Sequence, residues 1–99
     1  MILANHTLSF APEIEKEAIS WIHNEFKPLV ESCPHTSEVL FCRLTSDSEV
    51  TDTYVIQIRF PDSKEYDLYN TYFHTIYIEK LFEKFSNKFG IFSSTLEDL

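Results

Sequence analysis

The chain has 99 residues, of which 43% are apolar and 15% aromatic, which is typical of one small globular domain rather than a disordered segment. Sixteen acidic residues outnumber eight lysines and arginines and give a formal net charge of −8. Because this charge repels phosphate groups, we expect no nucleic acid and no anionic membrane as a partner.

No stretch is long and apolar enough for a membrane span or a signal peptide. Cys33 and Cys42 do not form a C-x-x-C pair, and we interpret them as reduced thiols. We therefore expect a cytoplasmic protein with a single domain over residues 1–99.

Residues 2–10 alternate between two faces, which predicts a strand. A helix is predicted from Pro12, because proline suits a first helical turn and apolar residues then recur at helical spacing to Leu29. Pro28 lacks a backbone N–H and should bend or restart that helix. Residues 32–37 end it as a loop.

Residues 38–45 and 53–60 alternate again and predict a hairpin, joined by an acidic loop over residues 46–52. A second helix follows, for which Asp62 and Glu65 form a capping box. Its predicted apolar stripe is Tyr66, Tyr69, Phe73, Ile76 or Tyr77, Leu81 and Phe85.

The end of the chain predicts a fourth strand over residues 88–96. Asn87, just before it, is a candidate for a left-handed helix cap. Gly90 predicts a bulge or a close approach of another group.

This order of elements, βαββαβ, is typical of the ferredoxin-like plait. The predicted fold class is α+β, with a four-stranded antiparallel sheet and two helices on one face. In three strands the even positions are more apolar, so we assign them to the helix-covered face. The odd positions then line an open face: Leu3, Asn5, Phe41, Arg43, Val55, Gln57 and Arg59. Such a mixed surface favours a homodimer interface or an enclosed cavity.

Fold alone does not define function, since this plait carries many unrelated activities. RNA-binding and phosphate-binding versions need glycine-rich segments, whereas the only glycine here is Gly90. A metal-carrying version needs paired cysteines in the first loop, which is Phe10-Ala11-Pro12 here. We therefore predict no metal site and no cofactor.

Among the histidines, His74 is the candidate catalytic residue, because it follows Asn70 by one helical turn and is flanked by aromatic residues. It is interpreted either as a proton carrier or haem ligand, or as a half-buried packing histidine. The second interpretation is the commoner one for such a position. His6 is interpreted as a hydrogen-bonded core histidine.

Five further residues are candidate ligand-binding positions. Asn5, Arg43 and Gln57 offer polar groups on the open face, where structural hydrogen bonds are the alternative. Tyr72 and Tyr77 flank His74 and would line a pocket around it.

The chain also resembles a family of short bacterial proteins classed as a domain of unknown function. That family is placed among the dimeric α+β barrel proteins, near the antibiotic-biosynthesis-type monooxygenases. The resemblance rests on Asn5, Thr7, Trp21, Pro28, Cys42-Arg43-Leu44, Thr53-Tyr54-Val55-Ile56-Gln57, Tyr66, Tyr69, His74, Lys88-Phe89 and Phe92. It implies a ferredoxin-like fold without an established activity. Relatives that degrade haem use an asparagine, a tryptophan and a histidine, and Asn5 and His74 stand in comparable places. Trp21 is on a helix, so that triad is incomplete.

Three hypotheses follow, and they leave open whether the protein is an enzyme. The first is a homodimeric plait that binds a small ligand or acts as an interaction module. The second is a cofactor-less monooxygenase-type enzyme with a cavity around His74 and Asn5. The third is a purely structural homodimer whose open face is filled by its partner.

Overall fold

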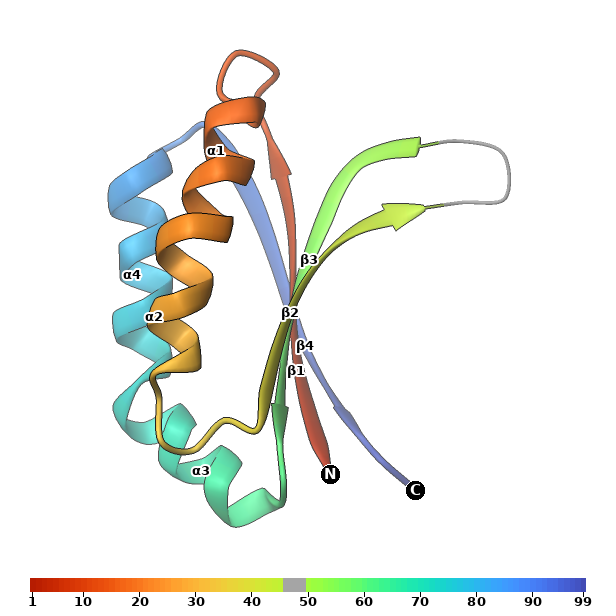
Figure 1. Cartoon of the computed structure of the whole chain (residues 1–99), viewed down its shortest axis with the longest axis vertical. Helices are drawn as coiled ribbons and strands as arrows, with labels where there is room; N and C mark the ends of the chain where they lie inside the picture. Colours follow the sequence, from red (N-terminus) through yellow and green to blue (C-terminus); the bar gives the residue numbers. More distant parts are fainter. Residues whose placement is uncertain (46–49) are drawn as a thin grey trace.

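The computed structural model describes residues 1–45 and 50–99 of the chain. Within this part, β1 (Ile2–Phe10), β2 (Glu38–Thr45), β3 (Val50–Phe60) and β4 (Phe89–Glu97) form one antiparallel sheet in the order β2-β3-β1-β4. All the helices lie on one face of this sheet, and the two chain ends lie at the same end of the molecule (Figure 1). The predicted ferredoxin-like plait is confirmed.

The first helical segment on this face is one continuous rod made of α1 (Glu15–Trp21), a π-helical turn (Ile22–Phe26) and α2 (Lys27–Glu31). Pro28 cannot donate a backbone hydrogen bond, and the wider π-helical turn lies just before it, as expected of a rod interrupted by proline. The predicted start at Pro12 is wrong. Residues 12–14 form a turn in which the Ile14 N–H donates to the Ala11 carbonyl at 3.1 Å.

The second helical segment, beside the first, consists of α3 (Ser63–Tyr72) and α4 (His74–Phe85). The predicted N-cap is confirmed, because the Asp62 carboxylate accepts a hydrogen bond from the Glu65 backbone N–H at 2.9 Å. Phe73, with φ −121° and ψ −36°, separates the two helices. The run of aromatic and β-branched residues from Tyr72 to Ile78 has low helix propensity, which accounts for a break that the apolar spacing did not predict.

At the end of α4 the chain turns sharply into β4. Ser86, and not the predicted Asn87, takes a positive φ of 52°. The Lys88 N–H donates to the Phe85 carbonyl at 3.0 Å and closes the turn. Gly90 shows the predicted close approach, since a Cβ there would lie 3.1 Å from the Ser9 hydroxyl oxygen.

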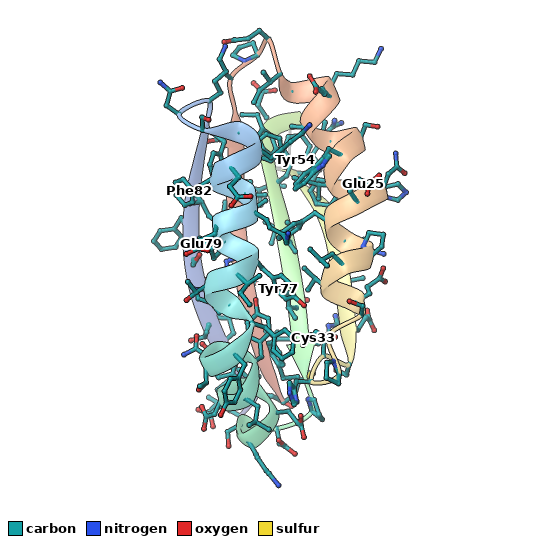
Figure 2. All side chains as sticks on the ribbon, turned by 90° about the vertical axis from the view of Figure 1, so that its left-hand side faces the viewer. Glu25, Cys33, Tyr54, Tyr77, Glu79 and Phe82 are labelled. Carbon is teal, nitrogen blue, oxygen red and sulfur yellow. The ribbon has the colours of Figure 1, made fainter. Side chains whose placement is uncertain are left out.

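The core lies between the helices and the sheet. Even positions of β1 and β3 point into it, and Leu8, Ile56, Ile58 and Phe60 are fully buried. From the helices, Tyr77 and Leu81 complete this layer, whereas Ile76 is half exposed. Figure 2 shows Tyr77 between the two helical segments and Phe82 on the outer side of α4.

In β2 the predicted face assignment of Phe41 and Arg43 is wrong. Val39 pairs with Ile58, Phe41 with Ile56 and Arg43 with Tyr54. Residues directly opposite each other share a face, so the odd positions of β2 lie with the even positions of β3 on the helix side. The two faces of β2 are almost equally apolar, and for this reason the alternation alone did not fix its orientation.

The open face therefore consists of the odd positions of β1 and β3 together with the even positions of β2 and β4. Its apolar members include Leu3, Leu40, Cys42, Val55, Phe92 and Leu96. A row of polar side chains crosses it: Gln57 donates to Asn5 at 3.1 Å, and Arg59 donates to Gln57 at 3.3 Å.

The predicted loop over residues 46–52 is only partly described. Residues 46–49 lie outside the described part, and β3 already begins at Val50. Among residues 1–45 and 50–99, no helix is both long and apolar enough to cross a membrane.

Candidate functional site

A cavity of about 240 Å³ lies between the α3–α4 helical segment and the strands β1 and β4. We call it the imidazole cavity, because two histidine rings form part of its wall. Its lining residues are Ala4, His6, Tyr66, Tyr69, Asn70, His74, Ser93, Ser94 and Thr95.

Simple periodicities bring these residues together. Tyr66, Asn70 and His74 are spaced by four residues and fall on one side of the α3–α4 helical segment. Across from them, His6 is an inward position of β1 and pairs with Ser93 of β4. The cavity thus lies at the end of the core, where polar side chains of α3 and α4 meet polar side chains of β1 and β4.

His6 is the most buried polar residue of this wall, with 3% of its surface exposed. Its Nδ1 is hydrogen-bonded to the Ser93 hydroxyl at 2.7 Å. Its Nε2 is buried and has no hydrogen-bond partner. A buried polar atom without a partner is uncommon in folded proteins, because its desolvation is not compensated.

The His74 ring stacks on the His6 ring, with 5.7 Å between the centroids and 30° between the planes. Burial, together with a smaller contribution from the neighbouring His74, lowers the pKa of His6 to about 4. Burial also lowers the pKa of His74. Both imidazoles are therefore neutral at pH 7, which leaves each with one nitrogen that accepts and one that donates.

Tyr69 forms part of the floor and is 1% exposed. Its hydroxyl is a second buried polar atom without a partner. Burial raises the pKa of this hydroxyl, with further contributions from Tyr77, Cys33 and Tyr66, so it stays protonated. Its ring packs edge-on against His74, with centroids 6.1 Å apart, and is tilted against Phe60, with centroids 4.8 Å apart.

The geometry does not suit a metal ion. Lone pairs of stacked rings lie in nearly parallel planes and do not converge on one point, and a histidine pair leaves a metal short of ligands. Across the described residues, no group of three or more His, Cys, Asp or Glu side chains gathers as a metal site.

A wider hollow of about 620 Å³ lies over α1 and α4 beside Trp21. It is lined mainly by charged side chains, and two of them, Lys84 and Glu17, pair with each other at 3.7 Å. Such self-paired surface charges are usually solvated and contribute little. We therefore place the candidate site in the smaller imidazole cavity.

Of the residues proposed from the sequence, only His74 lines this cavity. Tyr72 is 64% exposed, whereas Tyr77 is buried in the core. Asn5 and Gln57 bond to each other on the open face, on the far side of the sheet from His74.

Arg43 also lies away from the cavity. It donates to the Tyr54 hydroxyl at 3.2 Å, and that hydroxyl donates to the Glu15 carboxylate at 2.5 Å. These polar groups connect β2, β3 and α1, which is a structural role.

The sequence reasoning missed His6, Asn70 and Ser93 as members of one site. Two signals were present. The first is the four-residue spacing of Tyr66, Asn70 and His74, and the second is the run of small polar residues at 93–95 in an otherwise apolar strand. What joins them is the pairing of β1 with β4, which a single sequence does not reveal.

A protein family described as a domain of unknown function (DUF4286) matches residues 1–99, the whole chain. No curated protein matches the chain.

Several solved structures share the fold. A protein of the ethyl tert-butyl ether D (EthD) family from Bacillus halodurans superimposes with a TM-score of 0.75 at 13% identity, covering 100% of both chains. A protein from Deinococcus radiodurans, described provisionally as an antibiotic biosynthesis monooxygenase, gives a TM-score of 0.73 at 10% identity, covering 100% of this chain and 93% of that one. A dimeric ferredoxin-like protein from an uncultured marine organism gives a TM-score of 0.66 at 11% identity, covering 99% and 97%. At these identities the likeness concerns the fold.

Proposed function

Because the chain belongs to the family of the domain of unknown function DUF4286, its function has to be inferred from its own residues, and we propose that it is a homodimer that binds a small molecule in the imidazole cavity. The observation that carries the binding role is the imidazole cavity itself, in whose wall the His6 and His74 rings stack on each other. Imidazole, hydroxyl and amide groups in this wall offer hydrogen-bond donors and acceptors to a small molecule.

The proposal of a homodimer rests on the open face of the sheet. Phe92 is 69% exposed there and Leu96 is 49% exposed. These apolar side chains alternate with polar ones such as Thr7 and Ser94, and a mixed surface of this kind is typical of an interface, across which the polar row from Asn5 to Arg59 would supply hydrogen bonds. A similar solved structure is described as dimeric, which supports a second copy of this chain as the occupant.

An enzyme of the cofactor-less monooxygenase type is a second candidate. Such an enzyme would use a cavity histidine to accept a proton, a step that contributes about a hundred- to ten-thousand-fold to a rate, and the lowered pKa of both rings makes them weak bases at pH 7. In this version His74 keeps the role expected from the sequence, and His6 and Asn70 stand where Asn5 was expected. Asn5 of the same subunit lies across the sheet and would act at the dimer interface.

We also propose a cytoplasmic location, in keeping with the unpaired thiols of Cys33 and Cys42.

Two measurements test the proposal. Sedimentation at tens of micromolar should give the mass of a dimer, with at least about 1,000 Å² buried in total. A screen of small fragments of every charge type, followed by backbone NMR shifts, should give hits that move Asn70, His74 and Thr95. Hits incubated in air and analysed for oxidised products would separate an enzyme from a binding protein. If no fragment moves these residues while the dimer is intact, the third hypothesis, a purely structural homodimer, takes the place of the proposal.

A further inference from the structure

We infer that the protein pairs with a second copy of itself through the β1–β4 part of the open face, where the Phe92 ring of each copy fills the hollow above Gly90 of the other. This inference rests on the proposed homodimer and specifies where its two-fold axis lies. It follows from the shape of this part of the open face, the distribution of charge over the molecule and the symmetry of a homodimer.

A hollow of about 330 Å³ lies on the open face where β3, β1 and β4 run side by side. Ser9 of β1 pairs with Thr53 of β3 on one side and with Gly90 of β4 on the other, and all three residues line the hollow. Thr7 and Phe92, the next pair along β1 and β4 on this face, also line it. The hollow therefore lies directly beside the Phe92 side chain.

Gly90 leaves this part of the open face without a side chain. Its φ is not positive, so the backbone itself does not require glycine here. A Cβ at this position would lie 3.1 Å from the Ser9 hydroxyl oxygen, and a longer side chain would extend into the hollow. The glycine thus keeps the hollow open to a group from outside the chain.

Phe92 is the protruding group beside the hollow. It is 69% exposed, so most of its ring lies in water in a single copy. Aromatic rings that insert into a recess of a partner are among the side chains that contribute most to the affinity of an interface. A protruding ring and a recess on the same face make this surface complementary to itself.

The distribution of charge favours a second copy on this face. With a net charge of −8, two copies repel each other wherever their acidic side chains meet. The paired positions that β1, β3 and β4 contribute to the open face are uncharged except for Arg59, which pairs with Glu38 at 3.6 Å. The wider hollow over α1 and α4 instead carries Glu13, Glu17 and Glu25. Two copies therefore approach each other at lower electrostatic cost through the open face.

Symmetry then places the axis of the dimer. In a two-fold dimer, a contact from the ring of one copy to the hollow of the other occurs twice. Gly90 and Phe92 are two residues apart on one strand, which corresponds to about 7 Å. The axis therefore passes close to Ile91, between them. The two Phe92 rings then lie side by side across the axis at about 7 Å, which is within the range of aromatic contacts.

Sedimentation equilibrium of the full-length protein tests the role of Phe92. Phe92→Ala should raise the dissociation constant of the dimer at least about a hundredfold, because both copies lose a central ring. Leu96→Ala is the matched control, since Leu96 is on the same strand and face and is 49% exposed. Leu96 lies about 17 Å from the axis along the strand, so its truncation should raise the dissociation constant by no more than about tenfold. Equal losses in the two variants would overturn the inference.

Filling the hollow tests the role of Gly90. Gly90→Val places a side chain where the incoming ring would lie, and should also raise the dissociation constant at least about a hundredfold. Circular dichroism shows whether this variant is folded. A folded Gly90→Val protein that dimerises as tightly as wild type would show that no ring enters the hollow.

A direct measurement on the wild-type protein decides the matter if Gly90→Val does not fold. Dimers are prepared from one ¹³C-labelled and one unlabelled copy, and isotope-filtered NMR then detects contacts between the copies only. We expect contacts from the Phe92 ring protons to the Gly90 α-protons, and none from the Leu96 methyl groups to Gly90. A dimer without the contact between Phe92 and Gly90 would overturn this inference and leave the proposed homodimer intact. A wild-type monomer at tens of micromolar would overturn both.

Discussion

The imidazole rings of His6 and His74 stack across the boundary between the sheet and the helices, with their centroids 5.7 Å apart. His6 belongs to the first strand and His74 begins the last helix, so this contact joins the two layers of the fold. The two rings also form part of the wall of the imidazole cavity. The stability and the binding of the protein therefore both depend on this pair.

Stability should fall in mild acid because of His6. The pKa of the folded state is lowered to about 4 from 6.5, so the unfolded chain binds the proton more tightly. The stabilisation is complete above pH 6.5 and is lost as the pH falls from 6.5 to 4. The loss should amount to about 3 kcal/mol from this shift of about 2.5 pKa units.

Denaturant unfolding at a series of pH values measures this effect. His74, whose pKa is also lowered, contributes with the same sign. The His6→Phe variant should show a much shallower decline between pH 6.5 and 4, because it lacks the His6 ring that takes up the proton. The carboxylates that titrate in the same range are unchanged in the variant and account for the decline that remains. Identical pH profiles for wild type and variant would contradict the burial of a neutral His6.

Tyr69→Phe should leave stability unchanged or raise it by up to about 1 kcal/mol, because it removes a buried hydroxyl that has no partner. Tyr77→Phe is the matched control. Burial and the neighbouring Cys33 raise the pKa of the Tyr77 hydroxyl to about 12, and this hydroxyl is not among the buried polar atoms without a partner, so its removal should be destabilising. A loss of more than about 1 kcal/mol for Tyr69→Phe in urea unfolding would show that its hydroxyl is paired.

Ser86→Gly should stabilise the protein by about 1 kcal/mol. With φ 52° and ψ −124°, Ser86 occupies a backbone region that glycine adopts without steric cost. Asn87→Gly, at the next residue, lacks this positive φ and should give no gain. The two melting temperatures, measured side by side, decide the matter: a lower value for Ser86→Gly would mean that the serine is not strained.

Phe92→Asp should shift the protein from dimer to monomer, because it places a charge in the apolar part of the open face. Ile76→Asp is the control, since Ile76 is 50% exposed but lies on the helical layer. Sedimentation of both variants at equal concentration measures the effect. A dimer that persists in Phe92→Asp and dissociates in Ile76→Asp would place the interface on the helices.

The fold was largely predictable from the sequence, because alternation and helical spacing are strong in β1, β3 and α4. The orientation of β2 was not, since Leu40, Cys42 and Leu44 on one face are as apolar as Val39 and Phe41 on the other. Only the pairing of Val39 with Ile58 decides between them. The break at Phe73 was missed for a different reason, because local propensity there acts against an otherwise regular apolar stripe.

The candidate site was predicted only in part. His74 was identified from its helical neighbours, whereas His6 was interpreted as a hydrogen-bonded core residue. That interpretation holds for Nδ1, which bonds to Ser93, but not for Nε2. Ser93 follows His6 by 87 positions in the chain, and only the β1–β4 pairing brings them together.

The most direct test of the central claim is the ring ¹⁵N spectrum of the four histidines during a titration with a hit of the fragment screen at pH 7. The account predicts that the signals of His6 and His74 move. The signals of His23 and of His35, which is bonded to Glu65 at 2.5 Å outside the cavity, should stay in place. If the hit binds while the signals of both His6 and His74 remain unchanged, the imidazole cavity is not the binding site.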